Sequence, residues 1–430
     1  MRLILPAFIL AIFCSNVINA QRVCSSEEYA LQLQADPVSK KGIADAARQV
    51  TATLKQKNTS GVLLRDTTSN EIIYIPVVVH LLYKTATENI SDAQVKSQID
   101  VLNKDFSRMN ADRTNTPAAF AGVAADSRIQ FCLAKVDPKG QKTTGIDRVY
   151  TNKDFFTTDD AMKFTASGGA ASWNSSQYLN IWVVKLNGRS LAYATPPGAA
   201  AEKDGLVISY DVFGNIEKVR AVFNKGRTAT HEIGHWLGLV HTWGDALCGD
   251  DHVDDTPQQY SYNFGCPTFP KMSSCSPNAN GDMFMNYMDF SDDACMNMFT
   301  KGQVKRMRAV FAQGNVRNGF LNSIACDSSN AQAGPLPDTT KPATPDPAHV
   351  NVTAPKMYPN PVVNVMTVDH KLSQTGTINL RIFTATGVLV YTKTLVGEKT
   401  THNLSNLTRG TYLVQIANGK NTFNSKIIKL

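Results

Sequence analysis

The stretch from Thr230 to Trp243, THEIGHWLGLVHTW, places metal-binding residue types in an otherwise apolar, helix-forming background. Because positions i and i+4 of an α-helix share one face, His231 and His235 can direct their imidazoles to one point. Gly238 can adopt the left-handed conformation that ends a helix, so that the chain turns back and His241 completes three ligands. Three protein ligands with a fourth position open to water are typical of a catalytic zinc site. The alternative interpretation is three histidines satisfied by hydrogen bonds on a buried helix.

Glu232 follows the first histidine and can hold a water at the metal without being a ligand itself. From there it can accept a proton from the water and pass it to a leaving amine. The complete order H-E-x-x-H-x-x-G-x-x-H is a metzincin signature, which favours the zinc site over the buried-helix alternative. The signature also requires a methionine turn below the metal, and we assign this turn to Met288 in the segment NYMD.

The residues before this stretch must form the scaffold that positions it. Alternating and β-branched patterns predict strands over 71–83, 129–137, 178–186 and 205–213, and an amphipathic pattern predicts a helix over 92–109. These elements indicate an α/β part before the zinc-binding stretch, with a mainly helical continuation after it.

Composition and the first residues indicate an exported protein. The 430 residues are 43% hydrophobic, enough for at least two cores, and the net charge of +7 comes from scattered lysines and arginines. Without a dense basic run, we expect no nucleic-acid partner. Residues 1–20 form an apolar segment with one positive charge and a small residue at Ala20, as in a cleaved signal peptide. A weaker alternative uses Cys14 for lipid attachment. No later apolar run is long enough to suggest a membrane span.

A second compositional boundary lies near the C-terminus. Residues 329–355 are rich in proline and small polar residues and predict an extended linker. Residues 356–430 contain short alternating strands that predict a small β-sandwich. The segments YPNP and KIIK within it resemble the C-terminal sorting domain of type IX secretion substrates, which implies the type IX secretion machinery as a partner. A sandwich that binds carbohydrate or protein is the alternative.

The central part of the chain resembles the pappalysin family of metzincins, and within it the small ulilysin-like secreted proteases. The resemblance rests on HEIGHWLGLVHTW, on DDHVDDTPQQ after the next cysteine, and on NYMDFSDDACMNMFT, and it covers about residues 70 to 326. It implies an α+β fold class, with a metzincin catalytic domain over 65–328 that is followed by the all-β sandwich. The catalytic domain would have an upper twisted sheet with helices and a lower helical, loop-rich subdomain. It also implies that a substrate peptide lies along an edge strand, which we assign to residues 190–197.

Disulfide bonds and a calcium site follow from the same resemblance. It implies the pairs Cys248–Cys275 and Cys266–Cys295 below the cleft. Cys132 and Cys326 remain, and either they pair or Cys132 is a buried free thiol. The acidic run after Cys248 resembles the calcium site of the family, where carboxylate, hydroxyl and carbonyl oxygens would bind Ca²⁺. The candidate ligands are Asp251, Val253 through its carbonyl, Asp254, Asp255 and Thr256; a solvated acidic loop is the alternative.

Two positions near the methionine turn bear on specificity and catalysis. The resemblance implies that Asp293 lines the pocket just after the scissile bond and selects arginine there, through a charge-assisted pair. An aspartate that caps a local turn is the alternative. Phe290 departs from the family pattern, which has a tyrosine at this place, so the group that stabilises the oxyanion is not identified.

The N-terminal segment predicts latency. Cys24 can bind zinc through its thiolate and occupy the open fourth position, as in a cysteine-switch propeptide, which we expect over residues 21–64. A disulfide partner for Cys24 is the alternative. An enzyme that prefers arginine after the cut could process itself at Leu64–Arg65.

Together these features predict a secreted, zinc-dependent endopeptidase that is made as a zymogen and acts on protein or peptide substrates. A surface binding protein or adhesin with a vestigial protease domain is one alternative. Intact Glu232 argues against it, since a binding-only site has no use for a base. A zinc amidase that acts on non-protein amides is the other alternative.

Overall fold

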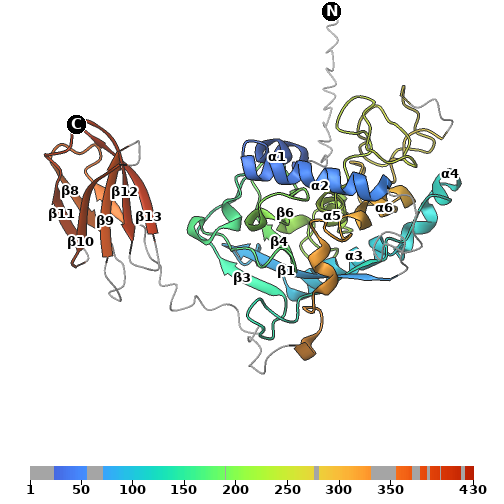
Figure 1. The fold of residues 1–430 in the computed structure, drawn as a ribbon, viewed down its shortest axis with the longest axis horizontal. Coiled ribbons are helices and arrows are strands. Elements are labelled where there is room, and N and C mark those ends of the chain that lie inside the picture. The colour runs from blue at the N-terminus through green and yellow to red at the C-terminus, as the bar shows by residue number, and fades with distance from the viewer. Residues whose placement is uncertain are drawn as a thin grey trace, which may run out of the picture. The chain divides into compact units, whose positions relative to one another are not determined.

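The computed structural model describes residues 24–55, 71–188, 190–275, 280–330, 355–369, 378–384, 388–397, 399–417 and 422–430 (Figure 1). The chain divides into two compact units, one formed by most residues up to 335 and the other by most residues from 336 onward. The predicted signal peptide, the Leu64–Arg65 bond and most of the proline-rich linker lie outside the described residues.

A mixed sheet forms the centre of the first unit, in the order β2-β1-β4-β6-β5, with β3 also paired to β1. The strands are β1 (Ile73–Tyr83), β2 (Ile129–Leu133), β3 (Ile146–Tyr150), β4 (Leu179–Val184), β5 (Ala192–Ala194) and β6 (Leu206–Ser209). All pairings are parallel except that of β5, which runs antiparallel to β6 at one edge of the sheet. The predicted edge strand within residues 190–197 is therefore confirmed.

The central strand β1 explains why the sheet is buried on both faces. Its sequence IYIPVVVHLLY is almost continuously apolar, as expected of an inner parallel strand, and all but one of its residues are buried. Its first half pairs with β2 and its second half with β3, so one long strand organises two neighbours on the same side.

Helices pack against this sheet. The main helix before the zinc-binding stretch is α3 (Asp92–Phe106), which the hydroxyl of Ser91 caps by accepting from the Gln94 N–H. Its apolar side joins β1, α5 (Arg227–Trp236) and α6 (Lys301–Ala309) in one core. The remaining short elements are α4 (Ala118–Ala121) and the 3-10 helices η1 (Ala111–Asn115), η2 (Ala161–Lys163), η3 (Thr165–Ser167), η4 (Ala201–Lys203), η5 (Tyr210–Val212), η6 (Ala221–Phe223), η7 (Asn318–Asn322) and η8 (Ser328–Asn330).

The part below α5 consists of long loops and the single helix α6. In the described residues between α5 and α6, backbone pairing is limited to isolated bridges such as Asn286 with Met298. A capping box between Thr300 and Gln303 starts α6. The lower subdomain is thus richer in loop than the sequence pattern alone indicates.

Two N-terminal helices, α1 (Ser26–Leu33) and α2 (Pro37–Lys55), lie over the strand edge and the zinc-binding helix (Figure 1). α1 contacts β5, and α2 contacts α6. The segment before the catalytic domain therefore covers the region where a substrate strand would lie.

The second unit is a β-sandwich, as predicted. One sheet has the order β10-β9-β12-β13 and the other β11-β8-β7, all antiparallel. Its strands are β7 (Lys356–Tyr358), β8 (Val365–Asp369), β9 (Ile378–Thr384), β10 (Leu389–Leu395), β11 (Lys399–Asn403), β12 (Gly410–Ala417) and β13 (Thr422–Lys429). Alternating residues from both sheets, such as Val368 and Ile416, share one core. Across both units, no helix in the described ranges has the length and apolar character needed to cross a bilayer.

Candidate active site

The helix α5 carries the first two candidate ligands and is buried along its whole length. It packs against α3, β5 and β6, so its residues have fixed positions relative to the edge strand. Gly226 precedes the helix in the left-handed region, with φ of 75°, a conformation that glycine adopts without strain. Gly238 follows it with φ of 87°, and this turn brings His241 back toward the helix.

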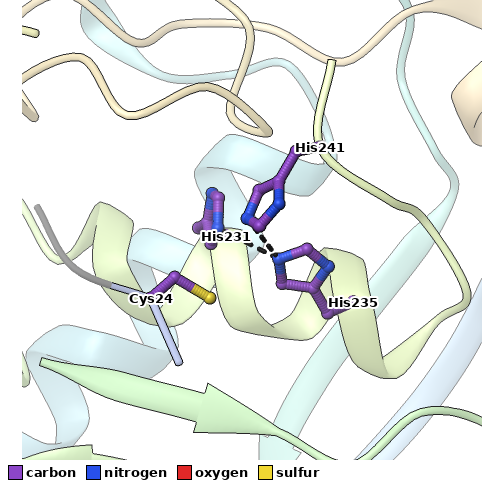
Figure 2. Close-up of side chains that lie close together, drawn as sticks. All are labelled: Cys24, His231, His235 and His241. Carbon is purple, nitrogen blue, oxygen red and sulfur yellow. Dashed lines mark hydrogen bonds between the residues drawn. The ribbon is translucent and has the colours of Figure 1, made fainter. Parts of the chain in front are cut away.

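The imidazoles of His231, His235 and His241 converge on one point (Figure 2). The Nε2 atom of His235 lies 3.1 Å from Nε2 of His231 and 3.1 Å from Nε2 of His241. Nitrogens about 2.0–2.1 Å from a tetrahedral zinc ion lie roughly 3.3–3.4 Å apart, so this spacing matches a shared metal.

The other ring nitrogens fix the tautomers of these histidines. Nδ1 of His231 lies 2.7 Å from the Tyr287 carbonyl oxygen, and Nδ1 of His235 lies 3.0 Å from that of Leu239. Nδ1 of His241 contacts a carboxylate oxygen of Asp245. Because each Nδ1 faces an acceptor, it carries the proton, and the three Nε2 lone pairs point at one another. A cation is the group that fits between them.

Burial also keeps the central ligand neutral. Desolvation, together with the neighbouring His241, lowers the pKa of His235 to about 3. An uncharged imidazole is the form that binds a metal. The buried-helix alternative would leave three lone pairs facing one another in a buried site, and the donor set therefore fits zinc.

Cys24 completes a four-residue group with the three histidines (Figure 2). The four candidate ligand atoms lie within 4.8 Å of one another, and this is the one group of metal-binding type found in the described residues. Burial and the nearby Glu232 carboxylate raise the pKa of the Cys24 thiol, so a cation in the site is needed for the thiol to lose its proton. Cys24 is a free cysteine, which excludes the alternative of a disulfide partner.

Glu232 is buried and faces the same region from α5. Its Oε2 accepts a 2.7 Å hydrogen bond from the hydroxyl of Ser26, which lies two residues after Cys24. The Ser26 oxygen in turn accepts the backbone N–H of Ala194 on the edge strand, at 2.8 Å. The N-terminal segment therefore contacts the candidate metal ligands, the candidate base and the edge strand at once.

Met288 lies directly below α5. Its sulfur approaches Gly234 so closely that a Cβ at that position would lie 2.4 Å from it. A glycine between the two helical histidines therefore allows the methionine turn to contact the helix.

Aromatic rings form one wall of the site. Trp243 stacks on His241, with ring centroids 4.2 Å apart, and Phe290 lies 4.9 Å from His241 and 4.8 Å from Trp243. Tyr262 stacks on Phe290 and also contacts the edge of Trp243. The residue at the place of the family tyrosine thus has a packing role in this chain.

Comparison with known proteins identifies this arrangement. A model of the family described as pregnancy-associated plasma protein-A, a peptidase family, matches residues 167–312, and a model of the secretion system C-terminal sorting domain matches residues 356–430. An extracellular metalloprotease of Pyricularia oryzae is 36% identical over 233 residues, which are 52% of this chain and 69% of the relative. One from Verticillium alfalfae is 33% identical over 265 residues, 58% of this chain and 78% of the relative.

The chain belongs to the pappalysin family of metalloproteases.

Solved structures of the same type agree with the fold. Mature mirolysin of Tannerella forsythia, solved with a cleaved peptide, is 50% identical with a TM-score of 0.58, and the match covers 59% of this chain and 96% of that one. A promirolysin mutant is 43% identical with a TM-score of 0.64, and covers 73% of this chain and 100% of that one. The predicted metzincin fold, the secreted zinc metalloendopeptidase class and the sorting tail are confirmed.

The predicted calcium residues of this pappalysin are only partly brought together. The Thr256 hydroxyl lies 2.8 Å and 2.7 Å from the two Asp251 carboxylate oxygens and 2.8 Å from the Val253 carbonyl oxygen. Asp254 is exposed, and Asp255 instead accepts the Gly302 N–H of α6 at 2.9 Å. Burial raises the pKa of Asp251 to about 6.

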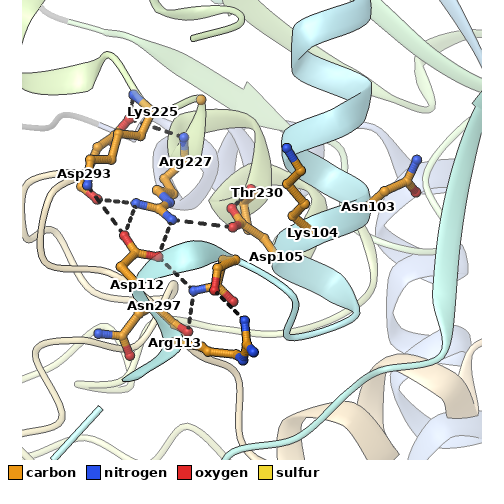
Figure 3. Close-up of polar contacts among 12 residues, drawn as sticks. Asn103, Lys104, Asp105, Asp112, Arg113, Lys225, Arg227, Thr230, Asp293 and Asn297 are labelled. Carbon is orange, nitrogen blue, oxygen red and sulfur yellow. Dashed lines mark hydrogen bonds and ion pairs between the residues drawn. The ribbon is translucent and has the colours of Figure 1, made fainter. Parts of the chain in front are cut away.

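Asp293 is fully buried beside the start of α5 (Figure 3). Its Oδ2 accepts the backbone N–H groups of Lys225 at 2.9 Å and Arg227 at 3.2 Å. The Arg227 guanidinium donates to the Asp293 carbonyl oxygen and forms a bidentate pair with Asp112. This network joins the methionine-turn region to the zinc-binding helix.

Three disulfides occur among the described cysteines. Cys248 pairs with Cys275, and Cys266 with Cys295, in the loops below the site. Cys132 pairs with Cys326, so the alternative of a buried free Cys132 is wrong.

Sequence reasoning missed several residues that the site uses. Asp245 supports His241, but an aspartate four residues after a histidine is too common a pattern to signal this role. Ser26 and Tyr29 were part of a helical segment with no distinctive motif. Their partners, Glu232 and Asp160, lie more than a hundred residues away, which no local pattern reveals.

Proposed function

We propose that this pappalysin hydrolyses peptide bonds with zinc held by His231, His235 and His241 and with Glu232 as the general base and acid. The observation that carries the proposal is the convergence of three deprotonated Nε2 atoms beside a buried glutamate and the edge strand β5. When bound there, zinc supplies a Lewis acid that polarises the scissile carbonyl and lowers the pKa of a water.

The chain's own residues supply the remaining chemistry. After the N-terminal segment has left, a substrate strand pairs with the edge of β5, which holds the scissile bond near α5. Glu232 takes a proton at its carboxylate and returns it to the leaving amine nitrogen. The acceptors on the three Nδ1 atoms keep the imidazoles in one tautomer throughout, and Met288 supports the helix from below.

The segment 21–64 acts as a propeptide in this proposal, and 65–328 is the catalytic domain. Cys24 occupies the fourth ligand position as a cysteine switch, while Ser26 blocks the proton acceptor of Glu232. The likeness to promirolysin supports this latency, since it spans a larger share of the chain than the likeness to mature mirolysin. Cleavage at Leu64–Arg65 would release the segment.

Asp293 selects arginine after the scissile bond in this proposal. Support comes from its position five residues beyond Met288 and from its complete burial. Asp293→Asn should reduce the preference for arginine, and Asp292→Asn at the neighbouring position serves as the matched control. The asparagine keeps an oxygen for the two backbone N–H groups, and a melting curve checks that the variant is folded.

Calcium binding at Asp251, Val253 and Thr256 is the last part of the proposal. One hydroxyl proton of Thr256 cannot satisfy three acceptor oxygens at once, so the group has the excess of oxygen lone pairs that Ca²⁺ prefers. Asp254 and Asp255 stand near enough in sequence to join after small rearrangements of the loop. Ca²⁺ should raise the Tm of the wild-type protein, and Asp251→Asn should abolish this rise.

The experiment that tests the function is digestion of a proteome-derived peptide library by the activated full chain, with and without a zinc chelator. Chelator-sensitive cuts before arginine support both the mechanism and the Asp293 pocket. Cuts with another preference support the zinc mechanism and contradict the pocket. Absence of cuts by a folded, zinc-loaded protein contradicts the proposal.

A further inference from the structure

Beside the edge strand, the catalytic domain holds the side chain of Tyr29 in a deep slot. Tyr29 comes from α1 of the N-terminal segment and is 1% exposed. Its ring lies 4.5 Å from that of Tyr193 on β5, and the two belong to a core that also contains Trp182 and Met162. The slot is therefore built by the catalytic domain and filled by the segment that covers it.

Polar groups at the bottom of the slot match a phenol. The Tyr29 hydroxyl donates to the Asp160 carboxylate, with both oxygens at 2.8 Å. It accepts from the ammonium of Lys163, at 3.0 Å. Burial and the Asp160 charge raise the pKa of Tyr29, so the phenol keeps the proton that it donates.

Apart from Tyr29, the groups that hold Lys163 inside the slot belong to the catalytic domain. It is 1% exposed, forms an ion pair with Asp160 at 2.9 Å and donates to the Lys203 carbonyl oxygen at 2.8 Å. Its ammonium lies 5.3 Å from the ring centres of both Trp182 and Tyr193. We expect these contacts to remain when the N-terminal segment leaves. Lys163 then loses only the hydroxyl and the ring of Tyr29.

Asp160 is fixed in an unusual backbone conformation, with φ of 61°. Aspartate adopts this region more readily than most residues other than glycine, so the backbone can hold the carboxylate here without severe strain. Neither Asp160 nor Lys163 has a part in the zinc chemistry, so the mechanism leaves this buried pair without a role.

The residue that fills the slot follows closely after the residue that contacts the candidate base. The hydroxyl of Ser26 contacts Glu232. Ser26 is the first residue of α1, and Tyr29 follows it three positions later in the same helix. Side chains three apart on a helix start about 5–6 Å from each other. An extended peptide covers this distance in about two residues.

We propose that the slot of Asp160, Lys163, Trp182 and Tyr193 is a substrate subsite for tyrosine, which Tyr29 occupies in the zymogen. The inference rests on the proposed function: removal of the N-terminal segment empties the slot, and a tyrosine two or three residues from the scissile bond then fills it. A hydroxylated ring is required, because a plain phenyl ring would leave the Asp160 carboxylate and the Lys163 ammonium each short of one buried partner.

Calorimetry on the intact full chain tests the slot without any proteolysis. The tyrosine probe is phenol and the phenylalanine probe, as the matched control, is benzene, because Tyr29→Ala leaves beneath α1 a cavity of the size of the missing ring. The Tyr29→Ala zymogen should bind the tyrosine probe roughly ten-fold or more tightly than the phenylalanine probe, since a site built for a hydroxyl rejects the analogue that lacks it. The wild-type zymogen, with Tyr29 in place, should bind neither. Equal binding of both probes to Tyr29→Ala, or no binding, overturns the proposal.

A variant of the slot itself provides the second arm. Asp160→Asn keeps the shape and tolerates the same backbone conformation, and it should weaken tyrosine-probe binding in the Tyr29→Ala background. In the peptide library, the activated wild-type chain should show tyrosine enriched two or three residues from its cuts, and Asp160→Asn should lose that enrichment at unchanged arginine preference.

The outcomes separate the two proposals. Cuts without tyrosine enrichment overturn the subsite even if the protease function holds. Tyrosine-probe binding without any cuts supports the slot and contradicts the protease proposal alone.

Discussion

The hydrogen bond between Ser26 and Glu232 makes latency sensitive to a single hydroxyl. Ser26→Ala removes a buried donor to a carboxylate at 2.7 Å and leaves the Ala194 N–H without its acceptor. A hydrogen bond to a charged group contributes about 1.5–3 kcal/mol, and about 1.4 kcal/mol corresponds to a factor of ten. In the open form, water satisfies both groups, so the substitution favours opening. We expect the fraction of open zymogen to rise by roughly 10–150-fold.

The assay is the initial rate of a fluorogenic peptide cleaved by intact zymogen, with a gel at each time point to show that the segment is still attached. Ser25→Ala is the matched control, because its hydroxyl bonds to Ser190 at 2.9 Å and does not contact the base. Cys24→Ala in both backgrounds separates the contribution of the thiol. Equal initial rates for Ser26→Ala and Ser25→Ala would refute the role of the hydroxyl.

Three further changes test other parts of the structure. Asp245→Asn replaces the charged acceptor on His241 and should weaken zinc binding by about 10–100-fold, as measured by competition with a chromophoric chelator; unchanged affinity would exclude a supporting role. Cys132→Ser removes the disulfide between residues 194 apart in sequence. In the chain-entropy model this lowers the free energy of unfolding by up to about 5 kcal/mol, which is measured as a lower Tm. Burial raises the pKa of Asp289 to about 6. Because this is above the unfolded value of about 3.9, the folded state binds more protons, and the free energy of unfolding falls by roughly 2 kcal/mol as the pH rises from 4 to 7. A series of urea titrations in which Asp289→Asn shows the same dependence on pH would contradict this.

The sequence predicted the zinc-binding helix because its information is local. Spacings of four and six residues place His231, His235 and His241 on one helix and its following turn, and Gly238 has the left-handed φ that this turn requires. The strands were predicted for the same reason: β1 is an apolar run whose pattern belongs to a buried parallel strand whatever surrounds it. The pattern of apolar residues within one helix or strand can be recognised without knowing which other elements pack against it.

Contacts between distant elements were beyond such reasoning. The calcium residues were grouped through the resemblance of their acidic run to the calcium site of the family, yet Asp255 accepts from Gly302 of α6 and Asp254 is exposed. Likewise, the disulfide between Cys132 and Cys326 joins residues 194 apart in sequence. The sequence therefore left open whether these two cysteines pair or Cys132 is a buried free thiol.

The N-terminal segment shows the same limit in a functional setting. Cys24 was found because a thiol near a mature N-terminus is chemically conspicuous, whereas Ser26 and Tyr29 are common residues of an ordinary helix. What distinguishes them is the partner across the interface: a carboxylate on the zinc helix for Ser26, and an aspartate–lysine pair for Tyr29. Each partner belongs to the catalytic domain and is exposed to a new occupant when the segment leaves. Glu232 is then left to the reaction itself, whereas the aspartate–lysine pair is left for a side chain, so in our proposal Tyr29, and not Ser26, marks the residue type that the emptied cleft accepts.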